Sequence, residues 1–175
     1  MPRQRGTVLQ IAHVVRDLEK AVAHWTDTLG AGPFYVARFR VDDHLYRGRV
    51  GGFDATIAVG YLGDTIIELI CSNNAEPSVF NEVLERRGEG LHHYWLAADD
   101  LNAEMARYEA AGCPMIAYGD IPGVTRSAMM DTSALLGCYV ELQEIAPGIQ
   151  AVLAQMQAAH ANWDGSDPVR PYPGL

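Results

Sequence analysis

The sequence predicts an α+β fold in which one β-α-β-β-β unit occurs twice. Six residues separate Gln10 from the pair Asp17-Leu18, and six residues also separate His93 from the pair Asp100-Leu101. Each Asp-Leu pair opens a helix-like run that ends at a glycine, and each unit later contains a strand-like segment centred on a glutamate. Self-similarity of this kind is the signature of an internal duplication. It predicts two similar halves that share one site.

The first unit begins with a strand over residues 7–15, where β-branched and apolar residues dominate. Asp17 is a favourable N-cap for the next helix, and Gly30 is a natural C-cap. Between these caps apolar residues recur at helical spacing: Leu18, Ala21, Val22, Trp25 and Leu29. Further strands are expected at 34–40, 46–50, 55–61 and 65–70, with turns at Gly51-Gly52 and Gly63-Asp64.

The second unit follows a linker over residues 73–90, which contains a short helix near 79–86. It opens at Leu91, and Asp100 caps a helix that ends at Gly112. Strands are then expected near 115–117, 127–131 and 138–144, with loops at 119–125 and 133–137. An amphipathic helix is predicted after Pro147. The tail from Trp163 is too rich in proline and glycine for regular structure.

These boundaries predict a single domain over residues 1–147, with module one at 7–72, the linker at 73–90 and module two at 91–145. Residues 148–175 form the C-terminal helix and the irregular tail. A chain of 175 residues that is 49% hydrophobic and 20% charged can bury a core of its own.

The charge balance limits the classes of partner. The net charge is −9, with a single lysine, so the chain lacks the basic face that nucleic-acid binding requires. No apolar run is long enough to span a membrane, and no signal peptide is recognisable. The three cysteines lack metal-type spacing and are expected to be reduced thiols. We therefore expect a cytoplasmic protein that acts on a small molecule.

The repeated positions are candidates for one metal site. The four residues are Gln10, Glu68, His93 and Glu141. If the opening strands of both units are neighbours in a curved sheet, these side chains face one cavity. One imidazole, two carboxylates and an amide oxygen suit a single divalent ion of the Mn, Fe, Co, Ni or Zn type, with open positions for water or substrate. The alternatives are structural, such as glutamates that pair with arginine or a histidine packed in the core.

Other residues are expected around this site. Strand alternation places His13 and His92 on the opposite face from the candidate ligands, in a second layer or facing a helix. Aromatic and arginine residues on the strands can line a substrate pocket: Tyr35, Arg38, Tyr46, Arg47 and Trp95. Arg38 and Arg47 would bind a carboxylate or a phosphate, because a guanidinium offers two parallel donors. For each of these residues the alternative is ordinary packing or exposure on the surface.

Several phrases of the sequence resemble the vicinal oxygen chelate superfamily, which includes glyoxalase I, methylmalonyl-CoA epimerase, extradiol dioxygenases and bleomycin-resistance proteins. The resemblance covers about residues 7–145 and is greatest to the epimerase and glyoxalase branch. It is carried by Val14-Val-Arg-Asp-Leu, Leu29-Gly-Ala-Gly-Pro-Phe, Gly63-Asp-Thr-Ile-Ile-Glu-Leu-Ile, Gly88-Glu-Gly-Leu-His-His and Gly137-Cys-Tyr-Val-Glu-Leu. The resemblance implies two tandem βαβββ modules in a cupped, barrel-like mixed sheet with helices outside.

The resemblance also implies a divalent metal held by one ligand from the first and one from the last strand of each module. By position these ligands are Gln10, Glu68, His93 and Glu141. Many members have a histidine where this chain has Gln10, and an amide is a weaker, neutral donor. Proteins of this kind often form homodimers, which is therefore the expected assembly.

The reaction expected of such a site is proton abstraction next to a carbonyl, with the enolate stabilised on the metal. This would make the protein a metal-dependent isomerase, epimerase or glyoxalase-like lyase, with Glu141 as the first candidate base and Glu68 as the second. Because the two glutamates belong to different modules, they can approach the two faces of one carbon. The alternatives are a metal-free protein that binds or sequesters a small molecule, and an extradiol-type dioxygenase. The dioxygenase site requires two histidines and one carboxylate.

Overall fold

The predicted repeat is present in the computed structural model, which describes residues 6–121 and 125–173. The first unit contains β1 (Val8–Val14), α1 (Leu18–Leu29), β2 (Phe34–Tyr46), β3 (Arg49–Leu62) and β4 (Thr65–Ser72). The second contains β5 (Gly90–Ala97), α3 (Leu101–Ala110), β6 (Met115–Ile121), β7 (Thr125–Met130) and β8 (Tyr139–Ile145). The linker carries α2 (Val79–Arg86), and α5 (Pro147–Ala161) follows the second unit.

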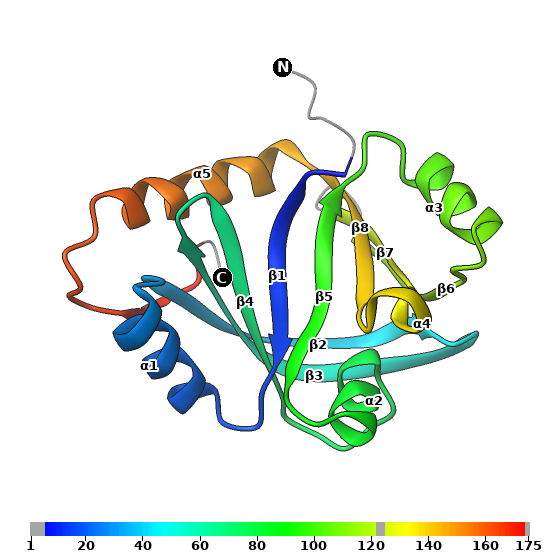
Figure 1. Ribbon diagram of the computed structural model, residues 1–175, viewed down its shortest axis with the longest axis horizontal. Coiled ribbons are helices and arrows are strands. Elements are labelled where there is room, and N and C mark those ends of the chain that lie inside the picture. The colour runs from blue at the N-terminus through cyan, green and yellow to red at the C-terminus, as the bar shows by residue number, and fades with distance from the viewer. Residues whose placement is uncertain (1–5, 122–124, 174–175) are drawn as a thin grey trace.

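The strands of both units join in one mixed, barrel-like sheet. The order of neighbours is β3-β4-β1-β5-β8-β7-β6-β2, and β2 also pairs with β3, so the sheet closes on itself. The opening strands β1 and β5 run antiparallel beside each other, as Figure 1 shows at the centre of the molecule. The sheet closes on its other side where Leu45 and Tyr46 of β2 pair with Tyr118 and Ala117 of β6. The fold class predicted from the sequence is therefore confirmed.

The helices cover the outside of the sheet and the two ends of the barrel. On the outer face, α1 packs through Val22 on the first unit, and α3 packs through Leu101 on the second. Inside the barrel, α2 contributes Val79 and Val83 to one end of the core, and α5 contributes Met156 to the other. Figure 1 shows α2 and α5 at opposite ends of the central strands. The interior between these two helices is where a cavity can form.

The expected helix caps are present in both units. The Asp17 side chain accepts a hydrogen bond from the backbone N–H of Lys20, and the Asp100 side chain accepts one from Ala103. Gly30 ends α1 in the left-handed conformation, with φ of 74°. Because each cap satisfies an N–H that has no partner within the helix, the two Asp-Leu pairs start their helices at equivalent points of the repeat.

The β2–β3 hairpin differs from the sequence prediction. The turn lies at Arg47-Gly48, where φ is 46° and 75°, and not at Gly51-Gly52, which are inside β3. Two successive residues with positive φ match the right-handed twist of a tight hairpin. Gly52 instead lies opposite an irregular part of β2, where the register of the β2–β3 pair shifts between Val41 and His44. A Cβ atom on Gly52 would overlap the carbonyl oxygen of Val41, so Gly52 leaves room for a β-bulge.

This bulge changes which residues of β2 face the interior. Before the bulge the odd-numbered residues point inward, as Tyr35 does. The extra residue reverses the alternation, so that His44 and Tyr46 point inward beyond it. A single inserted residue therefore decides which side chains of the hairpin reach the cavity.

Two smaller differences concern the second half. Residues Ser133–Leu136 form the short helix α4 where a loop was expected, and residues 119–121 belong to β6. Residues 122–124 of the expected 119–125 loop lie outside the described residues. In the tail, β9 (Val169–Pro171) pairs with β2 at the edge of the sheet, where proline is tolerated. Among the described residues, every helix is too short or too polar to span a bilayer.

The bulge makes a prediction about stability. Gly52→Ala should lower the free energy of unfolding by about 1–3 kcal/mol, because the backbone opposite it must shift. Gly51→Ala is the matched control, since a Cβ atom there meets nothing within 4 Å, and it should change the stability by less than about 0.5 kcal/mol. Urea denaturation measures both. Equal stability of the two variants would contradict the steric role of Gly52.

Candidate active site

Gln10, Glu68, His93 and Glu141 converge inside the barrel, one from each of the neighbouring strands β1, β4, β5 and β8. Gln10 Nε2 donates a hydrogen bond to Glu68 Oε2 over 2.8 Å. His93 Nε2 lies 3.6 Å from Glu68 Oε2 and 3.3 Å from Glu141 Oε2. The distance from His93 Nε2 to Gln10 Nε2 is 3.4 Å. The duplicated positions therefore meet at one point.

The three ionisable groups border a small cavity of about 160 Å³. Its lining is His44, Phe53, Ile57, Glu68, Val79, Phe80, His93, Ala117, Ser127, Met129 and Glu141. Val79 and Phe80 belong to α2, which closes this end of the barrel. The lining contains two carboxylates and neither arginine nor lysine. The alternative that arginines neutralise the two glutamates therefore does not describe this site.

The electrostatics of the cavity follow from burial of negative charge. Burial raises the pKa of Glu68 to about 7, and the charge of Glu141 acts in the same direction. Burial alone would lower the pKa of His93, but its hydrogen bond to Glu141 and the charges of both glutamates raise it above the ordinary value. The cavity therefore holds protons that the same side chains would release in water, and it favours any cation that replaces them.

His92 determines which nitrogen of His93 carries the proton when His93 is neutral. His92 Nε2 lies 3.1 Å from the backbone oxygen of Val79, and His92 Nδ1 lies 2.7 Å from His93 Nδ1. The Val79 carbonyl can only accept, so His92 Nε2 carries a proton. Burial keeps the pKa of His92 well below its usual value, so its other nitrogen is an acceptor. His93 Nδ1 must then donate, which leaves Nε2 with a free lone pair toward the glutamates when His93 is neutral.

The chemistry of this donor set fits a divalent metal ion. Across residues 6–121 and 125–173, no group of three or more His, Cys, Asp or Glu side chains has the arrangement of a metal site. Instead the side chains hydrogen-bond to one another, with the Gln10 amide nitrogen toward Glu68. A half-turn of that amide would present its oxygen. Two carboxylates, one imidazole lone pair and one amide oxygen then suit an ion of the Mn, Fe, Co, Ni or Zn type.

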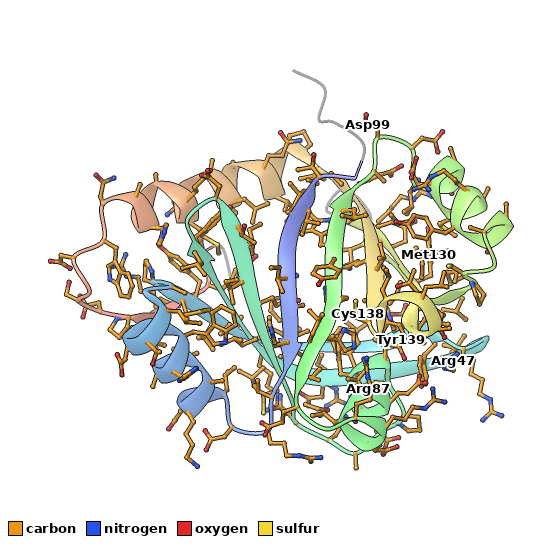
Figure 2. The ribbon with its side chains drawn as sticks, viewed as in Figure 1. Arg47, Arg87, Asp99, Met130, Cys138 and Tyr139 are labelled. Atoms are coloured by element: carbon orange, nitrogen blue, oxygen red, sulfur yellow. The ribbon has the colours of Figure 1, made fainter. Side chains whose placement is uncertain are left out.

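The two arginines expected to bind substrate are not part of this cavity's lining. Arg38 is on the outer face of β2, where it pairs with Asp54 over 2.5 Å. It is outside the cavity because it precedes the bulge and alternates with the inward-facing Tyr35. Arg47 is at the β2–β3 turn, where it pairs with Glu82 of α2 over 2.8 Å and with Asp131 over 3.2 Å. Figure 2 shows Arg47 at this end of the hairpin.

Tyr46 and Trp95 also make contacts with other residues of the protein. Tyr46 donates a hydrogen bond to Glu82 over 2.6 Å, and burial together with this contact raises the pKa of Tyr46 to about 12. Trp95 points into the barrel, pairs in register with both Gln10 and Glu141, and packs in the core beneath α5. Its indole Nε1 has no hydrogen-bond partner among the described residues. Trp95 therefore separates the site from the α5 end of the barrel.

His92 and His13, which were predicted to lie behind the candidate ligands, have different surroundings. His92 contacts His93 directly and does not lie on the opposite face as alternation predicts, because the register of β1 and β5 shifts at this point and leaves His92 as an extra residue that faces α2. His13 lies on the outer face of β1, where its ring packs edge-on against Trp25 of α1 at 5.2 Å. His44, which the sequence reasoning missed, lines the cavity. In the sequence only Gly52 could have indicated that His44 faces inward, because Gly52 makes room for the bulge. The alternation rule does not reveal such a bulge.

The comparisons with known proteins agree with this architecture. A model of the Glyoxalase/Bleomycin resistance protein/Dioxygenase superfamily matches residues 9–129. No curated protein matched the sequence. Among solved structures, methylmalonyl-CoA epimerase from Mycobacterium tuberculosis is 21% identical with a TM-score of 0.62, over 86% of this chain and 95% of that one.

Two further structures are similar. A variant of Streptomyces coelicolor methylmalonyl-CoA epimerase, in complex with 2-nitronate-propionyl-CoA, is 18% identical with a TM-score of 0.61, over 82% of this chain and 97% of that one. A hypothetical protein from Bacillus halodurans is 17% identical with a TM-score of 0.56, over 79% and 93% of the two chains. At these identities the similarity shows a shared fold.

The raised pKa of Glu68 predicts how stability depends on pH in chelator-treated protein. The folded protein binds the Glu68 proton more tightly than the unfolded chain, so the free energy of unfolding should fall as pH rises from about 4.5 to about 7. The raised pKa of His93 acts with the same sign. Glu68→Gln should reduce this slope and be more stable than the wild type at pH 8 by roughly 1–3 kcal/mol.

Urea denaturation between pH 4 and pH 8 measures this difference. Glu85→Gln, at an exposed position of α2, is the matched control and should follow the wild type. A Glu68→Gln variant that is less stable than the wild type at pH 8 would show that the buried carboxylate is not a destabilising charge.

Proposed function

Because the chain belongs to the glyoxalase/bleomycin resistance protein/dioxygenase superfamily, we propose that it is a divalent-metal-dependent isomerase, epimerase or lyase. In this proposal it removes a proton next to a carbonyl group and stabilises the enolate. The observation that carries the proposal is the cluster of two carboxylates and one imidazole, around a cavity lined by neither arginine nor lysine. Two carboxylates in such a cavity need protons or a cation to offset their charge.

Gln10, Glu68, His93 and Glu141 would hold the metal ion. When bound, the ion would polarise the substrate carbonyl and stabilise negative charge on its oxygen. The protein's own contribution is to orient this set: His92 keeps the Nε2 lone pair of His93 toward the glutamates, and Val79 and Phe80 of α2 cover one side of the cavity. A dry environment raises the basicity of a carboxylate, which then removes a carbon-bound proton more readily.

Glu141 is the first candidate for the base, and Glu68 is the second. Glu141 Oε2 lies 3.3 Å from His93 Nε2, and the Glu141 side chain is 20% exposed, compared with 15% for Glu68. The expectation that the two glutamates approach opposite faces of one carbon stays a prediction. Both lie within 3.6 Å of the same His93 nitrogen, one from each unit.

Methylmalonyl-CoA is the first substrate to test, because one solved structure of similar fold is an epimerase in complex with it. A cavity of about 160 Å³ can enclose only a small reactive group, so a larger substrate must leave most of its length outside.

The second candidate function is metal-free binding of a small molecule. It is favoured by the Gln10–Glu68 hydrogen bond, because the cluster satisfies itself without an ion.

The extradiol dioxygenase alternative finds less support. A site of that kind needs two histidines and a carboxylate, but His93 is the one histidine within 4 Å of the glutamates among the described residues. Both nitrogens of His92 are engaged by Val79 and His93. Oxygen consumption with catechols would revive this alternative.

The expected homodimer remains a prediction that sedimentation can test.

The metal-dependent function predicts that protein reconstituted with Mn²⁺, Co²⁺, Ni²⁺ or Zn²⁺ exchanges the α-proton of methylmalonyl-CoA, or of a panel of α-substituted carbonyl acids, with deuterium from D₂O. Glu141→Gln should slow this exchange by about 100-fold or more, because it removes a proton acceptor. Glu109→Gln, at an exposed position of α3, is the control and should exchange at the wild-type rate.

Mass spectrometry measures the exchange, and elemental analysis measures the bound metal. Ligand binding without metal, together with thermal stability that chelators leave unchanged, would favour the metal-free function. Wild-type turnover by Glu141→Gln would remove Glu141 from the chemistry.

A further inference from the structure

The C-terminal strap, residues 163–173, brings an aromatic side chain into the barrel from outside the duplicated units. Figure 1 shows this tail, in red, returning from the end of α5 to the start of β2. There β9 pairs in parallel with β2, with Arg170 opposite Tyr35. The ladder continues with a hydrogen bond of 3.2 Å from the Tyr172 N–H to the oxygen of Val36. Paired residues share a face, and so do alternate residues of a strand, so Tyr172 lies on the inner face with Tyr35.

Contacts along its length anchor the strap. At the end of α5, His160 Nδ1 lies 2.6 Å from the backbone oxygen of Gly32. Trp163 covers the same glycine, where a Cβ atom would lie 2.9 Å from the indole ring. Next to β9, the backbone N–H of Phe34 donates a hydrogen bond to the oxygen of Pro168 over 2.8 Å. The position of the strap's last residues therefore follows from a series of fixed points on the first unit.

Tyr172 packs beside the candidate cavity. Its ring meets Phe39 edge-on, with ring centroids 5.9 Å apart. Tyr172 and Ile57 both pack against the buried cluster that includes Val59. Val59 is the register partner of Glu68, and Ile57 belongs to the lining of the cavity. Tyr172 therefore lies on the same side of the interior as Glu68, just outside the cavity's lining.

The edge of β2 next to Tyr172 is unpaired. β3 occupies one edge of β2 along nearly its whole length, so β9 and β6 pair with the other edge. On that edge β9 reaches only to Val36, and β6 begins only at Leu45. Between these residues no described strand pairs with it, and the inward-facing Ala37 and Phe39 are half-buried. The inner face of β2 is therefore partly open to solvent beside Tyr172.

The Tyr172 hydroxyl is available as a hydrogen-bond donor. Burial raises the pKa of Tyr172, and the charge of Glu68 acts in the same direction, so the hydroxyl keeps its proton at neutral pH. Among the described residues, no side chain or carbonyl engages this hydroxyl. The Nε1–H group of Trp95, a residue only 3% exposed, also has no partner in that part of the chain. Because unpaired donors in the interior are costly, the interior favours a ligand that brings acceptor oxygens.

We propose that Tyr172 is a substrate-binding residue, and that its hydroxyl donates a hydrogen bond to a second oxygen-bearing group of the substrate, outside the cavity. This inference rests on the proposed function, in which the reacting end of the substrate lies at Glu68 and Glu141. It assigns the substrate to a chemical class: carbonyl acids that carry a second carboxylate or carbonyl group a few bonds away. The cavity of about 160 Å³ encloses the first group, and the open face of β2 leaves room for the second.

Binding of simple acids tests the contact without knowledge of the substrate. Ligand-observed NMR titration compares each dicarboxylate from malonate to adipate with the monocarboxylate of the same number of carbons, in metal-loaded and in chelator-treated protein. The wild type should bind at least one dicarboxylate about tenfold more tightly than its monocarboxylate, and Tyr172→Phe should lose this preference. Tyr94→Phe is the matched control and should retain it, because Tyr94 pairs with Ile11 and Val140 on the outer face of β5.

The comparison of the two ligands separates binding from folding. A general structural effect of Tyr172→Phe would weaken the monocarboxylate and the dicarboxylate alike, whereas loss of the contact weakens the dicarboxylate alone. Equal preference in Tyr172→Phe and wild type, or no preference in the wild type, would overturn the proposal. Absence of proton exchange by the wild type, with a preference that depends on Tyr172, would instead reject the proposed reaction and leave the contact in place.

Trp163→Ala tests the strap and retains the phenol. It removes the indole ring from Gly32, so the strap should hold Tyr172 less firmly and the preference for the dicarboxylate should fall. Val169→Ala, at an exposed position of β9, is the control and should leave the preference unchanged. An unchanged preference in Trp163→Ala would overturn the positioning role of the strap, and the Tyr172→Phe comparison would then decide the contact alone.

Discussion

Two carboxylates face one imidazole inside this barrel, and the rest of the site depends on that juxtaposition. Glu68 and Glu141 approach the same nitrogen of His93, within 3.6 Å and 3.3 Å. Removing two negative charges from water is costly, so the cluster must bind protons or a cation. The raised pKa values of Glu68 and His93 express this requirement. Because the four strands that carry the cluster are hydrogen-bonded neighbours, strand pairing holds the polar groups next to one another.

The linker helix belongs to the site as much as the strands do. Its Val79 carbonyl fixes the tautomer of His92, and His92 in turn fixes that of His93. The helix is held in place by Glu82, which accepts hydrogen bonds from Tyr46 and Arg47 at the end of the β2–β3 hairpin. An arginine that would suit a substrate anion is therefore used to anchor α2. The hairpin end, the helix and the His92–His93 pair form one continuous chain of contacts.

Sequence reasoning located the cluster because both of its rules are local. The caps at Asp17 and Asp100 define equivalent starting points, and alternation within short strands defines a face. The same rule failed along β2, because a bulge reverses alternation without changing composition. It also could not show that Arg38 faces outward, since alternation separates two faces without saying which one is buried. The short strand β9 was missed because its partner is β2, more than a hundred residues earlier in the chain.

The two units are alike in the strands that carry the cluster and differ in the hairpins on the other side of the barrel. In the first unit β2 and β3 have 13 and 14 residues, whereas β6 and β7 in the second have 7 and 6. The extra length lets the β2–β3 hairpin reach β6 and close the barrel opposite the cluster. Duplication alone would supply equivalent side chains from both units. The longer hairpin, with its bulge, adds His44 to the lining of the cavity.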